Sequence, residues 1–170
     1  LFLEHCWLRT SLLGVTRGKG RRQGATSIGA FFEWYIAGRK EFQNCGIVSM
    51  NDDAAAAVFQ KMVMLGFKAL LPCFQKEFDS TDDSKSYLRF VKPVEKKKKG
   101  ILALKREGLN SYIDYKATTL NAYDSGRLSF LLGDEFGKWE RVNVNLYWSK
   151  VSKTLREGRK KVGFAYMPTT

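Results

Sequence analysis

Two short segments, about a hundred residues apart, contain the residue types that phosphate chemistry needs. Residues 18–27 read Gly-Lys-Gly-Arg-Arg-Gln-Gly-Ala-Thr-Ser, and residues 128–135 read Leu-Ser-Phe-Leu-Leu-Gly-Asp-Glu. A glycine-rich loop before a helix can bind phosphate through backbone N–H groups, while a lysine adds charge and a hydroxyl reaches Mg²⁺. An aspartate after a buried strand is the usual partner of such a loop, because it also contacts the metal. Together, the two segments indicate a phosphate-binding site.

The loop departs from the standard Walker A pattern G-x-x-x-x-G-K-[ST]. Gly24 and Thr26 match the last glycine and the hydroxyl, but Ala25 occupies the lysine position, and Lys19 and Arg22 lie upstream. The flexible side chain of a lysine at the first loop position can still cross the loop toward the β and γ phosphates. The alternative is that residues 19–22 form only a basic turn before a helix.

The sequence around both segments predicts the elements that would position them. Apolar residues within 11–16 form a short run typical of a buried parallel strand, and apolar residues from Ile28 to Ile36 recur at helical spacing. Residues 128–132 are expected to form another strand. Ligands of parallel sheets bind at the carboxyl ends of the strands, so Asp134 and Glu135 are expected beside the loop. Alternatively, this acidic pair only caps a following helix.

The rest of the chain alternates strands with amphipathic helices, which predicts an α/β fold with a mainly parallel sheet. The acidic segment 74–85 is expected to form surface loops, and a turn at 124–126 is expected to join two of the strands. The further strands are expected at residues 45–50, 87–91, 110–118 and 161–167, and the further helices at 54–71, ended by Pro72, and 142–156.

Composition limits the classes of function. The chain has 170 residues, 44% of them hydrophobic, which suits one folded domain. Its formal charge of +12 favours a polyanionic partner, above all nucleic acid. Three widely spaced cysteines and one histidine give no zinc site, disulfide framework or histidine-based triad. The apolar runs are too short for a membrane helix, so no membrane partner is expected.

The loop resembles the deviant Walker A motif of large terminase subunits, the ATP-driven motors that package viral DNA. The resemblance rests on Lys19 placed upstream of Gly24-Ala25-Thr26, with Arg22 between them. Residues 130–135 resemble a Walker B segment followed by its catalytic glutamate. The similarity extends over nearly the whole chain after about residue 12, and further stretches resemble tailed-phage terminases at residues 49–54, 109–115, 134–139 and 168–170.

The resemblance implies a P-loop NTPase fold of the RecA-like (ASCE) type, a three-layer sandwich that uses ATP and Mg²⁺. It implies that Lys19 and Arg22 stabilise phosphate charge, that Thr26 and Asp134 hold Mg²⁺, and that Glu135 acts on the attacking water. Thr169 and Thr170 resemble the motif that couples hydrolysis to movement. The other loop residues expected to bind the nucleotide are Gly20, Arg21, Gln23, Gly24, Ala25 and Ser27, together with Thr26.

The resemblance also implies partners: double-stranded DNA, a portal protein, a small terminase subunit and further copies of the chain in a ring, in the cytoplasm of an infected bacterial host. We expect residues 1–170 to be one ATPase domain, truncated at both ends and without the C-terminal nuclease domain or its activity. An adenine-contacting motif is not recognisable in residues 1–10.

Two alternatives stay open: another P-loop motor such as a helicase, and a non-catalytic basic nucleic-acid-binding module in which Ala25 marks an inactive loop. The lysine run 96–99 is either a DNA contact or a solvated turn.

Overall fold

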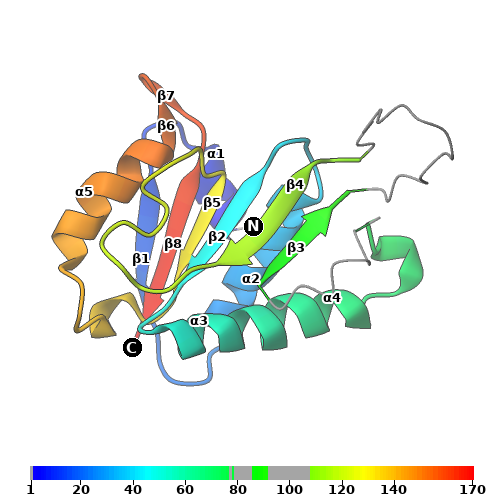
Figure 1. Cartoon of the computed structure of the whole chain (residues 1–170), viewed down its shortest axis with the longest axis horizontal. Coiled ribbons are helices and arrows are strands. Elements are labelled where there is room, and N and C mark those ends of the chain that lie inside the picture. Colours follow the sequence, from blue (N-terminus) through cyan, green and yellow to red (C-terminus); the bar gives the residue numbers. More distant parts are fainter. Residues whose placement is uncertain (1, 77, 79–85, 92–107) are drawn as a thin grey trace, which may run out of the picture.

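The computed structural model describes residues 2–76, 78, 86–91 and 108–170, and its centre is a six-stranded sheet (Figure 1). The strand order is β1-β8-β5-β2-β4-β3, and every neighbouring pair is parallel except β3 with β4. The prediction of a mainly parallel sheet is confirmed. The strands are β1 (Gly14–Gly18), β2 (Asn44–Val48), β3 (Tyr87–Phe90), β4 (Ser111–Tyr115), β5 (Phe130–Gly133) and β8 (Phe164–Thr169).

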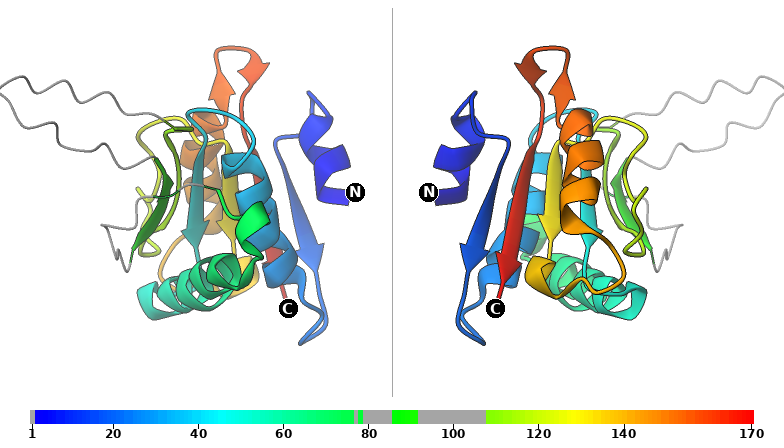
Figure 2. Two further views of the ribbon diagram at one scale, coloured as in Figure 1. Left: turned by 90° about the vertical axis from the view of Figure 1, so that its right-hand side faces the viewer. Right: turned by 90° about the vertical axis from the view of Figure 1, so that its left-hand side faces the viewer.

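Helices cover both faces of this sheet. One face packs against α1, α2 and a long helical rod, and the other packs against α5. The rod lies near the carboxyl ends of the parallel strands (Figure 2). The helices are α1 (Phe2–Leu8), α2 (Ala25–Ala37), the rod made of α3 (Asp52–Val58), the π-helical η1 (Phe59–Met64) and α4 (Leu65–Ala69), and α5 (Val144–Thr154), with short 3₁₀ turns η2 (Pro72–Phe74) and η3 (Phe136–Lys138).

Alternating side chains of the central strands pack into two separate hydrophobic cores, one on each face of the sheet. In β5, Phe130 and Leu132 pack with the α2 side, whereas Leu131 packs with the α5 side, and all three are completely buried. Strands buried on both faces read as continuous apolar runs, as β5 does. The structure is therefore the three-layer α/β arrangement expected from the sequence.

Several element boundaries differ from the sequence predictions. β1 begins at Gly14 rather than near residue 11, because the residues that pair with β8 are Gly14 to Gly18. The last strand starts at Phe164, because Lys161 belongs to a hairpin of β6 (Arg156–Glu157) and β7 (Lys160–Lys161) that was not predicted. The turn at 124–126 does not make β4 and β5 partners, because β2 lies between them.

The helices also differ in detail. The predicted helix 54–71 begins earlier, at Asp52, where the side chain of Asn51 accepts a hydrogen bond from the Ala54 amide at 2.8 Å. Its central π-helical turn has no signal in the apolar spacing. The short α1 was not predicted. The lysine run 96–99 lies outside the described residues. No helix in the described part of the chain is long and apolar enough to cross a bilayer.

One buried acid in α2 has no partner. Glu33 is completely buried, and neither of its carboxylate oxygens has a hydrogen-bond partner among the described residues. Burial, and secondarily the charge of Asp114, raise the pKa of Glu33 well above its usual value. Burial also raises the pKa of Asp114, to about 6. The folded chain therefore keeps protons that the unfolded chain releases as pH rises.

The free energy of unfolding should consequently fall as pH rises above about 4.5, the ordinary pKa of a glutamate, and Asp114 contributes to this fall up to about pH 6. The Glu33→Gln variant has no ionisable group at this position, so its stability should fall less over the same range. Urea unfolding at a series of pH values measures the difference. The exposed acid Glu41, changed to Gln, is the matched control. An equal pH dependence in wild type and Glu33→Gln would show that Glu33 is not neutral in the folded chain.

Candidate nucleotide-binding site

The glycine-rich loop connects the end of β1 to the start of α2. The amide of Lys19 donates to the carbonyl of Thr169 at 2.8 Å, and the amide of Gly20 donates to the side chain of Gln23 at 3.1 Å. Gly24 follows with φ +68°, a left-handed conformation that glycine adopts without strain. As the N-cap of a 13-residue helix, Gly24 has no side chain to accept from the first-turn amides, which suits a phosphate there.

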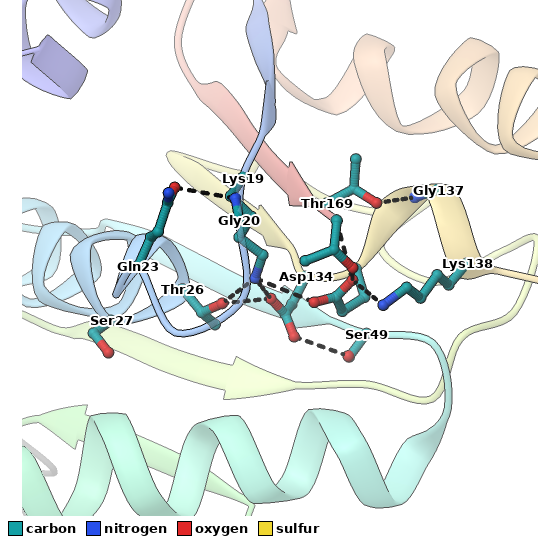
Figure 3. Close-up of polar contacts among 12 residues, drawn as sticks. Lys19, Gly20, Gln23, Thr26, Ser27, Ser49, Asp134, Gly137, Lys138 and Thr169 are labelled. Atoms are coloured by element: carbon teal, nitrogen blue, oxygen red, sulfur yellow. Dashed lines mark hydrogen bonds and ion pairs between the residues drawn. The ribbon is translucent and has the colours of Figure 1, made fainter.

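Lys19 reaches the far side of this loop (Figure 3). Its Nζ donates to Thr26 Oγ1 at 2.8 Å, and it lies 3.4 Å from Asp134 Oδ1 and 3.3 Å from Glu135 Oε1. The Thr26 hydroxyl donates to the same Asp134 oxygen at 2.7 Å. The structure therefore brings together the upstream lysine, the loop hydroxyl and both acidic residues, although Lys19 and Asp134 are 115 positions apart.

Asp134 is held at the carboxyl end of β5 by several neighbours. Its amide donates to the carbonyl of Val48 at 2.8 Å, and the hydroxyl of Ser49 lies 3.4 Å from Oδ2. The indole N–H of Trp139 donates to the backbone carbonyl of Asp134 at 3.0 Å. Sequence reasoning missed Ser49 and Trp139 as site residues. The position of Ser49 at the end of the neighbouring parallel strand was the available signal.

Glu135 is fixed on the other side of the site. Its backbone is left-handed, with φ 49°, and its carboxylate accepts from Lys138 Nζ at 3.0 Å and from Thr170 Oγ1 at 2.9 Å. Burial opposes ionisation here, but the hydrogen bonds from Lys138, Thr170 and Lys19 outweigh it and lower the pKa of Glu135 to about 2. The carboxylate is therefore charged at neutral pH. Lys138 was not identified from the sequence.

Other predicted residues lie at or beyond the margin of this cluster. Arg22 is exposed with φ 62°, and neither it nor exposed Arg21 makes a hydrogen bond or ion pair with another described residue. The hydroxyl of Ser27 lies 3.8 Å from the sulfur of Met62, away from the acidic pair. Thr169 Oγ1 accepts from the amide of Gly137 at 3.0 Å. The structure thus places Lys19, and not Arg22, beside the carboxylates.

The oxygen donors present fit Mg²⁺ better than a transition metal. Magnesium prefers hydroxyl, carboxylate, phosphate and water oxygens and is usually held by one or two carboxylates with substrate phosphates. Thr26 and Asp134 supply such oxygens side by side. Within the described ranges, no group of three or more His, Cys, Asp or Glu residues could hold a metal alone. Water and the phosphate oxygens of a bound nucleotide would supply the other ligands of a metal held by Thr26 and Asp134.

Solved structures share this architecture. The large terminase ATPase domain of Thermus phage P74-26 superimposes with a TM-score of 0.61 at 14% identity, over 92% of this chain and 59% of that one. A mutant of the same domain gives a TM-score of 0.59 at 15% identity, with the same coverage. The chain has the fold of a phage large terminase ATPase domain.

The terminase fold is also found in the HK97 bacteriophage large terminase, with a TM-score of 0.57 at 15% identity over 94% of this chain. The chain spans 59% of the P74-26 ATPase domain and 30% of the HK97 protein. No protein-family model matches the sequence, and no curated protein matches it significantly.

Proposed function

We propose that this chain is the ATPase motor domain of a DNA-packaging terminase, which hydrolyses ATP to drive double-stranded DNA into a viral procapsid. The observation that supports this most strongly is the cluster of Lys19, Thr26, Asp134 and Glu135 at the end of a glycine-rich loop. It occurs in a fold shared with terminase ATPase domains. Phosphoryl transfer needs positioning and charge stabilisation above all, and this cluster offers both.

Each side chain of the cluster has a defined role in this mechanism. The amides of residues 20–26 and the ammonium of Lys19 bind the phosphates, and Lys19 stabilises the charge that develops during transfer. Thr26 and Asp134 would hold Mg²⁺, which when bound neutralises phosphate oxygens. Glu135 orients the attacking water and accepts its proton. Arg22 would have to turn toward the loop to contribute, because its side chain has no contact with the cluster.

Thr169 and Thr170 are proposed to couple hydrolysis to movement. Thr170 donates to Glu135 and Thr169 accepts from the amide of Gly137, so the end of β8 contacts the segment that holds the acidic pair. A change in the contacts of Glu135 would therefore reach β8 directly.

Ala25 does not make the loop inactive in this proposal. Its side chain is buried, with 1% exposed, and Lys19 supplies the positive charge from the opposite end of the loop. A helicase would use the same chemistry, and the upstream lysine favours a terminase. The portal protein, the small terminase subunit, the ring of copies and the cytoplasm of the bacterial host belong to the same proposal.

Phosphate release measured with and without duplex DNA tests the proposed function. The motor should hydrolyse ATP only with Mg²⁺, and a non-catalytic module should release no phosphate under any condition. A chain that neither binds Mg²⁺·ATP nor hydrolyses it would refute the proposal.

Thr26 provides a test of the metal ligand. Thr26→Val has nearly the same shape but no hydroxyl, so we expect Mg²⁺-dependent ATP binding to weaken by about 10-fold to 100-fold, in the range found when a metal site loses a supporting group. Thr26→Ser keeps the hydroxyl and should bind almost normally. Titration calorimetry at several Mg²⁺ concentrations measures both variants. Equal metal dependence of Thr26→Val and Thr26→Ser would exclude Thr26 as a ligand.

A further inference from the structure

A second basic site lies at the end of the sheet opposite the loop. It is a pocket of about 300 Å³ lined by four basic residues, Lys40, Arg127, Lys160 and Lys161, with Gln43 among the polar neighbours and no acidic residue in its wall. This set of four is called the basic pocket below.

The basic pocket forms because parallel strands begin at the same edge. Lys40 precedes β2, Arg127 precedes β5, and Lys160 and Lys161 precede β8. The β6–β7 hairpin lies at this end of the strands, whereas the C-terminus lies at the other (Figure 1). The pocket is therefore separate from the candidate nucleotide-binding site, which lies at the carboxyl ends of β1 and β5.

The four basic side chains differ in their contacts within the protein. Lys161 stabilises the end of α1, because its Nζ donates to the carbonyls of Trp7 at 2.7 Å and of Arg9 at 2.8 Å. Lys40 lies over the ring of Trp7, 6.0 Å from its centre. In contrast, Arg127 and Lys160 are exposed and form no ion pair with any described residue.

The surroundings extend the positive surface. Arg156 and Arg159 of the hairpin region are exposed, and neither forms an ion pair in the described part of the chain. Two acids are nearby in sequence, Glu41 and Glu157, but neither lines the pocket. Cations spread over several elements fit a row of phosphates better than one small anion.

The pocket suits a duplex backbone better than unstacked bases. Single-strand binding uses exposed aromatic rings as stacking platforms. The only aromatic residue in this wall is Trp7, which is half-buried, covered by Lys40 and packed against Phe32 with ring centres 6.3 Å apart. Lysine and arginine side chains are instead typical phosphate contacts.

We infer that the basic pocket, with the adjoining hairpin, binds the phosphate backbone of double-stranded DNA. The choice of DNA as the polyanion rests on the proposed function, but the inference adds a defined surface far from the nucleotide. The hairpin leads into β8, and Thr170, the residue directly after β8, contacts Glu135. One strand therefore connects the DNA surface with the catalytic glutamate.

Fluorescence anisotropy with a labelled duplex, measured at several salt concentrations, tests this inference. The double variant Arg127→Ala/Lys160→Ala should bind about 10-fold or more weakly at low salt. Its slope of log K against log salt should become shallower by about 1.8, which corresponds to two lost phosphate contacts. Lys61→Ala/Lys68→Ala removes the same charge from exposed positions of the rod and should leave the slope nearly unchanged.

Three outcomes would overturn the inference: no DNA binding by the wild-type chain, an unchanged slope in the pocket variant, or equal losses in the pocket and rod variants. An effect on binding to anionic vesicles but not to duplex would also overturn it, by assigning the surface to a lipid. Thermal unfolding confirms that each variant is folded. Binding of Mg²⁺·ATP to the wild-type chain, measured in parallel, separates the two proposals. A wild-type chain that binds duplex but not Mg²⁺·ATP would refute the ATPase proposal without refuting the DNA surface.

Discussion

Steady-state ATP hydrolysis should fall by a factor of about 10² to 10⁴ when Glu135 is replaced by glutamine, the range that general-base catalysis contributes. The amide of glutamine is nearly the same size and can still accept the hydrogen bond from Thr170, but it cannot take a proton from water. ATP binding should change little, because the proposed phosphate contacts are made by the loop and Lys19 rather than by Glu135. Phosphate release and nucleotide titration, measured on the same preparation, separate the two effects.

Glu140→Gln is the matched control for this variant. Glu140 is exposed and lies five residues further along the chain. The Glu140→Gln variant should hydrolyse ATP at the wild-type rate. Wild-type turnover in Glu135→Gln would refute the role of Glu135, and a loss of ATP binding in that variant would indicate a structural role instead.

Replacing Lys19 with alanine should be the second large effect. The loss of a positioned cation at the transferred phosphate should lower hydrolysis by about 10² to 10³, as does removal of a single stabilising donor in other enzymes. ATP binding should also weaken, because Lys19 is the only basic side chain that contacts both Thr26 and Asp134 among the described residues. Hydrolysis rates over a range of ATP concentrations give both quantities.

The comparison with Arg22→Ala makes this prediction specific to the upstream lysine. If Arg22 rather than Lys19 supplies the charge, the result will be reversed: Arg22→Ala will lower hydrolysis by about 10² to 10³, and Lys19→Ala will lower it little. Lys61→Ala, on the exposed side of the rod, controls for the loss of one positive charge and should remain active. Lys19→Arg should recover part of the activity, since it restores the charge but not the compact ammonium group.

The strands of the sheet could be predicted from the sequence because the pattern of apolar residues that indicates them is local. Continuous apolar runs such as Phe130 to Leu132 are typical of strands that are buried on both faces. β5 is such a strand, because its side chains pack into the cores on both sides of the sheet. Boundaries were less accurate, because pairing across the sheet decides them. Lys161 illustrates this, since it pairs with Arg156 in the β6–β7 hairpin and donates to the carbonyl of Trp7 at the end of α1, neither of which the local apolar pattern encodes.

The candidate site was predictable where it follows a motif. The loop and the acidic pair occupy fixed places at strand ends, so motif spacing, together with the resemblance to large terminases, singled out Lys19, Thr26, Asp134 and Glu135, which the structure places side by side. Trp139 and Lys138 were not, because their roles depend on how the chain turns after β5. The buried, unpartnered carboxyl of Glu33 was not predicted either, since a glutamate in an amphipathic helix usually faces solvent.

The most direct measurement is a crystal structure of the Glu135→Gln variant with ATP and Mg²⁺. The account predicts phosphates bound by the amides of residues 20–26, Lys19 Nζ moved from Asp134 to a phosphate oxygen, and a metal about 2.1 Å from Thr26 Oγ1. A nucleotide bound elsewhere, such as in the basic pocket, or a loop with Lys19 still on the carboxylates and no metal beside Thr26, would contradict it.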